Sequence, residues 1–146
     1  MGSQLVSQDD MKLLKGLGVG GVLSLQDDND LRNLGMSFES LRHMSSAMGI
    51  DLRRVPVRDH EPAALISALP AAVSELVDLM NSYQRVYVHC TAGINRSAGV
   101  VLTYLVVKRG MGVVEAMALI RARRPFVSPY SSLVSALEQG TLRELR

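Results

Sequence analysis

Apolar residues alternate along the chain between short continuous runs and longer runs with helical spacing. In the first half, the runs at 19–26 and 50–59 predict strands, because each is short and bounded by turn-forming residues. Helices are predicted over 8–15, where Ser7 can cap the first turn, and over 37–48, where apolar residues recur every three or four positions. The pattern therefore alternates between helix and strand.

The second half of the chain predicts one strand and four helices. These cover residues 70–82, 86–88, 98–108, 113–123 and a final helix that Ser131 or Ser132 can cap. The segment 98–108 is apolar on nearly every face, so we expect a central buried helix. The whole pattern predicts an α/β fold with roughly four strands and helices on both sides of the sheet.

Composition narrows the class of protein. The 146 residues suit a single domain over 1–146, and 47% apolar with 21% charged residues is typical of a soluble globular protein. A net charge of +2 does not predict a nucleic-acid partner, and no apolar run predicts a membrane span. One cysteine excludes an internal disulfide framework, which favours a reducing intracellular compartment and leaves the thiol free.

That cysteine stands where a strand, a loop and a helix meet. Cys90 follows the strand at 86–88, and Arg96 comes six positions later at the start of the apolar helix. The first amides of a helix have no partner within it, so this junction favours an anion. Gly93 lets successive amides point inward, and a guanidinium can hold two phosphate oxygens at once. The predicted phosphate-binding residues are Thr91, Ala92, Gly93, Ile94, Asn95 and Arg96.

Cys90 at the base of this loop is predicted to be a nucleophile. The loop amides and Arg96 would stabilise its thiolate in line with a bound phosphoryl group, so the expected intermediate is a phosphocysteine. Ser97 can donate to the departing thiolate, and His89 can orient the loop by bonding its backbone. The alternative interpretation is structural, with a small buried cysteine and a serine that only caps the helix.

The string HCTAGINRSAG resembles the signature loop of the cysteine-dependent dual-specificity phosphatases. RRPFVSPYSSLVSAL resembles the segment that those enzymes carry after the next helix, with Tyr130 where many relatives have asparagine. The resemblance implies the compact protein tyrosine phosphatase fold, with a central, mostly parallel sheet. It also implies hydrolysis of phosphomonoesters without a metal or another cofactor.

A closer resemblance is to the plant plastid glucan phosphatases of the starch-excess type. LQDDNDLRNLGMSFESL, RRVPVRDHEP and VYVHCTAG are similar to that group in the same order, within about residues 19–138. This implies a phosphorylated, starch-like or glycogen-like glucan as substrate, in the plastid or the cytoplasm. A phosphoprotein is the alternative substrate, because Asn95 replaces a glycine of the group's loop and His60 replaces an aromatic residue.

Phosphoryl transfer to cysteine needs a general acid for the leaving oxygen, and Asp59 is the predicted acid. It ends the run at 50–59, and the resemblance places the family's acid at the same position. Glu61 is the alternative, and Arg58 can form a salt bridge that holds this loop. The presence of cysteine, arginine and acid argues against a non-catalytic phosphate-binding module. A rhodanese-type sulfur transferase would not need the acid.

Other candidate motifs predict no further chemistry. The acidic string at 27–30 is predicted to be a solvated turn rather than a metal site, because no ligand partner stands at a recognisable spacing. His43 and His60 stand alone, without a zinc pattern. The basic run Arg121, Arg123 and Arg124 is predicted to be a solvated helix end, with attraction of an anionic substrate as the alternative.

Overall fold

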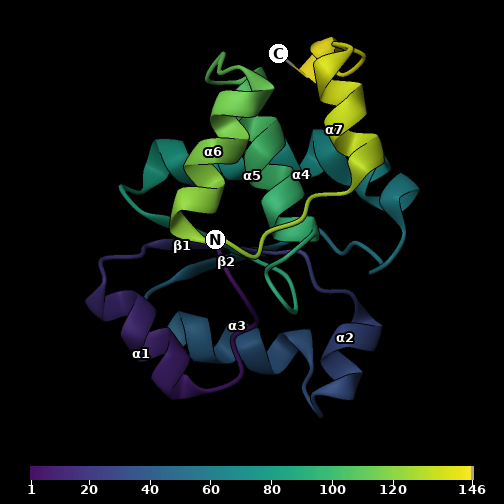
Figure 1. Ribbon diagram of the computed structural model, residues 1–146. Coiled ribbons are helices and arrows are strands. Elements are labelled where there is room, and N and C mark those ends of the chain that lie inside the picture. The colour runs from purple at the N-terminus through teal and green to yellow at the C-terminus, as the bar shows by residue number, and fades with distance from the viewer. Residues whose placement is uncertain (146) are drawn as a thin grey trace.

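A parallel sheet lies at the centre of the computed structural model, which describes residues 1–145 (Figure 1). Its strands are β1 (Gly21–Ser24), β2 (Asp51–Arg54) and β3 (Val86–His89), in the order β2-β1-β3. All four residues of β1 are buried, as is typical of the middle strand of a parallel sheet covered on both faces. Because all three strands are parallel, their carboxyl ends lie at the same edge of the sheet.

The predicted α/β class is confirmed, but the expectation of about four strands is wrong for the described residues, which form three. Regular pairing covers only part of the predicted runs at 19–26 and 50–59, and it ends with Ser24 opposite Arg54. Beyond that pair the backbone stays extended, and the Val57 N–H donates to the Leu25 carbonyl oxygen at 3.1 Å. These extended ends carry the chain from the sheet into the loops.

Three helices lie on one face of the sheet, below it in Figure 1. They are α1 (Gln8–Gly16), α2 (Asp28–Asn33) and α3 (Phe38–Ala47). Each begins with a reciprocal pair of side-chain-to-backbone hydrogen bonds, in which Ser7, Asp27 and Ser37 are the N-caps. The helices predicted near 8–15 and 37–48 are confirmed. The predicted turn at 27–30 is wrong, because these residues cap and begin α2.

Four helices cover the other face, above the sheet in Figure 1. They are α4 (Pro62–Ser82), α5 (Arg96–Val107), α6 (Val113–Arg123) and α7 (Ser131–Glu138), followed by a short 3-10 turn at Arg143–Leu145. The predictions for α5 and α6 are confirmed to within two residues. The predicted serine cap of α7 is wrong, because Tyr130 occupies the N-cap position without a side-chain cap bond.

Helix α4 begins eight residues before its predicted start at Pro70. Pro62 occupies the first turn, where a missing N–H is tolerated, and Pro70 lies inside the helix on its exposed side. Leu65 and Leu69 are fully buried, so packing outweighs the loss of one backbone hydrogen bond. By length and composition alone α4 is apolar enough to cross a membrane, a test that buried core helices also pass.

Two apolar clusters hold the helices to the sheet. The larger lies between the sheet and α4–α7 and includes Leu23, Val88 and Leu102. The smaller lies between the sheet and α1–α3 and includes Met11 and Val22. Because both faces of the short sheet are covered, its strand ends are held firmly and the loops that follow them start from fixed positions.

Candidate active site

The loop between β3 and α5 surrounds the sulfur of Cys90. This residue directly follows β3, and only 2% of it is exposed. Its Sγ accepts a hydrogen bond from the Gly93 N–H at 3.3 Å and lies 3.3 Å from Ser97 Oγ. Both contacts can direct a hydrogen-bond donor at the sulfur.

Gly93 makes the sharp bend of the loop. Its φ angle of 71° lies in the left-handed region, which residues with a Cβ rarely adopt. A Cβ at this position would also lie 2.5 Å from the backbone carbonyl carbon of Gly2. The segment containing Gly2 runs beside the loop, and its N–H donates to the Val88 carbonyl oxygen at 2.9 Å. Both the backbone angle and the close approach therefore require glycine.

Arg96 begins α5 and is only 1% exposed. Its Nη1 donates to Asp30 Oδ2 at 2.6 Å and to the Val57 carbonyl oxygen at 2.9 Å. Its Nη2 donates to Asp30 Oδ1 and to Thr91 Oγ1, both at 3.3 Å, and lies 3.0 Å from Asp59 Oδ2. Its Nε is buried and has no hydrogen-bond partner within residues 1–145. The terminal nitrogens thus hold the guanidinium in place.

Asp30 and Arg96 stabilise each other's charged forms. Burial would lower the pKa of Arg96, but the hydrogen bond and charge of Asp30 outweigh burial and raise this pKa. Burial would likewise raise the pKa of Asp30, but the hydrogen bond from Arg96 and further hydrogen bonds lower it. The two groups therefore remain ionised, and the guanidinium keeps its positive charge beside the cysteine loop.

Sequence reasoning does not identify Asp30 as part of the site, and its placement in a solvated turn is wrong. The Asp30 side chain is 12% exposed, and its contact with Arg96 joins residues 66 positions apart. A local signal was present, because acidic residues three apart, Asp27 and Asp30, can cap a helix reciprocally. That signal predicts the helix α2, but it does not predict the contact of Asp30 with Arg96.

Asp59 reaches the site from the loop after β2. Its Oδ2 lies 3.0 Å from Arg96 Nη2, and its side chain is 33% exposed. Glu61, the alternative acid, instead forms an exposed salt bridge with Arg58 at 3.2 Å. This is the salt bridge within the loop that the sequence predicts for Arg58. The fold therefore brings Asp59, rather than Glu61, to the cysteine loop.

Tyr130 also contacts this carboxylate. Its hydroxyl donates to Asp59 Oδ1 at 3.4 Å and accepts the backbone N–H of His60 at 3.0 Å. Burial and the nearby charge of Asp59 raise the pKa of Tyr130, so the hydroxyl stays protonated and donates. From the sequence Tyr130 stands out only as a departure from asparagine. Its partner is 71 positions away, and no local pattern connects them.

His89 is buried behind the nucleophile loop. Its Nδ1 lies 3.2 Å from the Cys90 carbonyl oxygen, a contact suited to the predicted orienting role. Its ring stacks on that of Tyr87 with the centroids 6.0 Å apart. Burial lowers the pKa of His89 to about 4, so the imidazole is neutral near pH 7 and donates from Nδ1.

The remaining loop residues are held from both sides. On the α2 side, Thr91 Oγ1 donates to Asp30 Oδ1 at 3.0 Å. On the opposite side, the Ala92 carbonyl oxygen accepts from Arg124 Nη2 at 3.4 Å, and the Ile94 carbonyl oxygen accepts from the Ser128 N–H at 3.0 Å. Arg124 is thus tied to the loop, while the other two arginines of the basic run are exposed on α6. Asn95 is the N-cap of α5 and makes no side-chain cap bond.

A cleft of about 360 Å³ adjoins Arg96 and opens to solvent. All of its lining residues have side chains that can form hydrogen bonds, and they are Asp27, Asn29, Asp30, Asn33, Arg58, Asp59, His60 and Thr91. No group of three or more His, Cys, Asp or Glu side chains within residues 1–145 is arranged to hold a metal ion. The cleft is therefore a polar surface built from α2 and the loop that carries Asp59.

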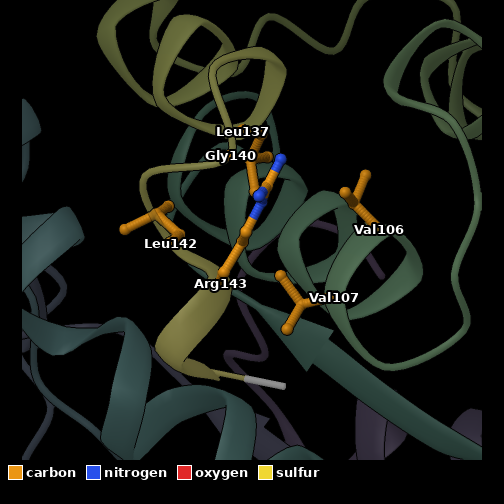
Figure 2. A pocket seen from close by; sticks show the side chains of 6 residues that line it. All are labelled: Val106, Val107, Leu137, Gly140, Leu142 and Arg143. Atoms are coloured by element: carbon orange, nitrogen blue, oxygen red, sulfur yellow. The ribbon is translucent and has the colours of Figure 1, made fainter.

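A second, much smaller pocket of about 30 Å³ lies at the other end of α5 (Figure 2). Val106 and Val107 line it from α5, and Leu137 and Arg143 close it from the C-terminal segment. Its size is that of a single water molecule, and it lies at the opposite end of α5 from Arg96.

The fold and the cysteine loop together define a cysteine-dependent phosphatase domain. Residues 4–141 match the family described as dual specificity phosphatase, catalytic domain, and the chain belongs to that family. Among solved structures, PTPMT1 in complex with PI(5)P shares the fold with a TM-score of 0.75 at 23% identity, covering 99% of this chain and 90% of that one. The human tyrosine phosphatase-like serine/threonine/tyrosine-interacting protein gives 0.73 at 21% identity, covering 97% and 88%.

Curated relatives include enzymes of two substrate classes. The phosphoglucan phosphatase DSP4, amyloplastic, of Castanea sativa is 32% identical over 138 residues, covering 93% of this chain and 37% of that protein. Dual specificity protein phosphatase 2 of Mus musculus is 31% identical over 130 residues, covering 89% and 37%. The chain thus spans little more than a third of the length of either relative. The predicted family resemblance, including that to the plant glucan phosphatases, is confirmed.

Proposed function

We propose that this chain hydrolyses phosphomonoesters through a phosphocysteine intermediate, without a metal ion, and that its substrate is a phosphorylated glucan. The observation that carries the reaction type is the convergence of Cys90, Arg96 and Asp59 on one loop. Arg96 Nη2 lies 3.0 Å from Asp59 Oδ2. Cys90 begins the loop that follows β3, and this loop ends where α5 starts with Arg96.

In the first step, the phosphate of the substrate binds to the loop amides and to Nε and Nη2 of Arg96. Nε supports this role because it is buried and unpaired within the described residues. The Cys90 thiolate then attacks phosphorus, a sulfur–phosphorus bond forms, and the bond from phosphorus to the ester oxygen breaks. Asp59 gives its proton to that leaving oxygen, which departs as an alcohol.

The pairing of Asp59 with Arg96 implies an exchange of partners when substrate binds. An ionised carboxylate cannot donate a proton, and here Oδ2 is occupied by Nη2. A phosphate dianion competes for the same nitrogen. Substrate binding would therefore free Asp59 from Arg96.

In the second step, water attacks the phosphorus of phosphocysteine. Asp59, now ionised, takes a proton from that water, the sulfur–phosphorus bond breaks, and inorganic phosphate leaves with Cys90 restored as a thiolate. Ser97 supports this departure, because its Oγ lies 3.3 Å from Sγ and can donate to the developing negative charge.

The polar lining of the cleft supports a glucan substrate. Asn29 and Asn33 place amide groups along one side of α2, and Arg58 and His60 face them from the loop that carries Asp59. Sugar hydroxyls need such donors and acceptors, and amides supply both. The similarity to the Castanea sativa enzyme supports the same substrate class, which would place the protein with stored glucan in the plastid or the cytoplasm.

A phosphoprotein is the second candidate substrate. The similarity to the mouse dual specificity enzyme supports it at nearly the same identity, and no Phe, Tyr or Trp side chain lines the cleft. Aromatic rings are the usual apolar platform for the face of a sugar, so their absence from these lining residues favours a peptide over a long glucan.

Phosphate release from solubilised amylopectin, compared with release from phosphoserine and phosphotyrosine peptides, decides between the two. We expect a higher kcat/KM on amylopectin, with all release abolished by Cys90→Ser. Faster release from peptides would reject the glucan proposal and leave the chemistry intact. Turnover that a chelator removes, or that survives Cys90→Ser, would reject the chemistry itself. Binding of phosphate without any turnover would indicate a non-catalytic module.

A further inference from the structure

The Asp59 carboxylate is held through each of its oxygens by a different part of the fold. Oδ1 accepts the Tyr130 hydroxyl at 3.4 Å and the His60 N–H at 2.9 Å. Oδ2 lies 3.0 Å from Arg96 Nη2, with the exposed His60 ring at 3.8 Å. The oxygen beside the arginine is therefore the one that adjoins the phosphate site, while the other oxygen is anchored away from it.

The backbone next to Asp59 needs an anchor. His60 has a φ angle of 60°, and among the described residues it is the one non-glycine residue with a positive φ. This left-handed conformation is uncommon for residues other than glycine, although histidine adopts it more often than most, and it persists where surrounding contacts impose it. The His60 N–H is bonded both to Asp59 Oδ1 and to Tyr130 Oη. Tyr130 thus contacts both the strained turn and the carboxylate that the turn presents.

Tyr130 is itself tied to the cysteine loop by a very short connection. Two residues before it, the Ser128 N–H donates to the Ile94 carbonyl oxygen at 3.0 Å. Pro129 between them is buried, and the Tyr130 carbonyl oxygen accepts the Leu133 N–H at 3.0 Å in the first turn of α7. The hydroxyl therefore has a fixed position relative to the cysteine loop.

We propose that Tyr130 is a positioning residue for the general acid, setting the distance and orientation of Asp59 relative to the phosphate site. By holding Oδ1, its hydroxyl directs Oδ2 toward the leaving oxygen. Its role rests on the proposed phosphatase chemistry, and it concerns the proton transfer alone rather than phosphate binding or nucleophilic attack.

The substitution Tyr130→Phe tests this role because it removes one oxygen and keeps the ring. On an alkyl ester such as glycerol phosphate, we expect kcat/KM to fall about tenfold, as for the loss of one hydrogen bond to a charged group. On nitrophenyl phosphate, whose leaving group needs little protonation, we expect kcat/KM to be unchanged. In an Asp59→Asn background, the substitution should cause no further loss on the alkyl ester.

Tyr83→Phe is the matched control. Tyr83 also donates to a carboxylate, Asp51 Oδ2 at 3.3 Å, but it is the C-cap residue of α4 and does not line the cleft. Equal behaviour of the two tyrosine variants on glycerol phosphate would overturn the inference. So would equal losses on both esters, or a full loss on top of Asp59→Asn. Failure of the proposed phosphocysteine mechanism is distinguishable from failure of this inference, because it would appear as turnover that survives Cys90→Ser.

Discussion

The Asp30 carboxylate holds both terminal nitrogens of Arg96, at 2.6 Å for Nη1 and 3.3 Å for Nη2. Through this pair α2 fixes a guanidinium that belongs to α5, on the other side of the sheet. Removing one partner of a buried ion pair leaves the other charge uncompensated. This lowers the stability of the fold more than replacing both partners by apolar residues would.

Asp30→Asn keeps the shape of the side chain and removes its charge. We expect the free energy of unfolding to fall by about 3 kcal/mol, because Arg96 would stay buried with a weaker partner. We also expect kcat/KM to fall by a similar factor on alkyl and aryl esters, because Arg96 serves phosphate binding in both. Urea unfolding and steady-state kinetics measure the two effects. Asp28→Asn, at an exposed position of the same helix, is the control, and equal effects of both variants would contradict this role for Asp30.

Cys90→Ser should abolish turnover while preserving phosphate binding. The hydroxyl fits the space of the thiol but is not ionised near neutral pH, so it cannot attack phosphorus. Hydrolysis of nitrophenyl phosphate should drop to the background rate, and calorimetric titration should still detect inorganic phosphate. Retained turnover would refute the assignment of the nucleophile.

Asp59→Asn should separate substrates by their leaving groups. Loss of a general acid is expected to reduce kcat/KM about 10²–10⁴-fold on alkyl esters and much less on nitrophenyl phosphate. Glu61→Gln is the control, since its side chain pairs with Arg58 outside the arginine site. Equal losses on both esters for Asp59→Asn, or a larger loss for Glu61→Gln, would move the acid elsewhere.

His89 should make the fold less stable as the solution becomes acidic. Burial lowers the pKa of His89 to about 4, against 6.5 for an exposed histidine. Between these values the unfolded chain binds a proton at this position and the native protein does not, so the free energy of unfolding falls as pH falls from about 6.5 to 4. The full effect is about 3 kcal/mol.

The measurement is urea unfolding at several pH values across that window. His89→Asn should remove most of this part of the pH dependence, whatever its effect on stability at neutral pH. His43→Asn, at an exposed site on α3, should leave it in place. An unchanged slope in His89→Asn would show that other groups carry the acid sensitivity.

Gly93→Ala should impair the loop more than its small size suggests. The alanine would have to adopt the left-handed φ of 71°, and its Cβ would lie 2.5 Å from the Gly2 backbone. We expect phosphate binding and turnover to fall together, because the amide of residue 93 would leave Sγ. Gly110→Ala is the control, since it has the same φ of 71° with open space around it. Comparable kinetics for both variants would show that the contact with Gly2 is unimportant.

Local pattern was enough to predict Cys90, Gly93 and Arg96 because strand, loop and helix are consecutive there. Asp59 needed a family resemblance, since a carboxylate 31 positions away carries no local mark of its role. Asp30 and Tyr130 depend on contacts across 66 and 71 positions, which arise only when the sheet brings separate loops to one edge.

The errors in the fold have similarly physical causes. The start of α4 was misplaced because Pro70 suggests a first turn, while the burial of Leu65 and Leu69 extends the helix through it. The strands were predicted too long because apolar composition continues past the last paired residue, Ser24, into extended backbone that is buried without regular pairing.

The isolation of Cys90 has a consequence for oxidative damage. The chain contains no second cysteine, so an oxidised sulfur cannot be protected by forming a disulfide within these 146 residues. A sulfenic acid at Cys90 would have to be rescued by a thiol from another molecule, before further peroxide converts it to an irreversible acid. Recovery from oxidative stress would then follow the supply of external reductant to a sulfur that is 2% exposed.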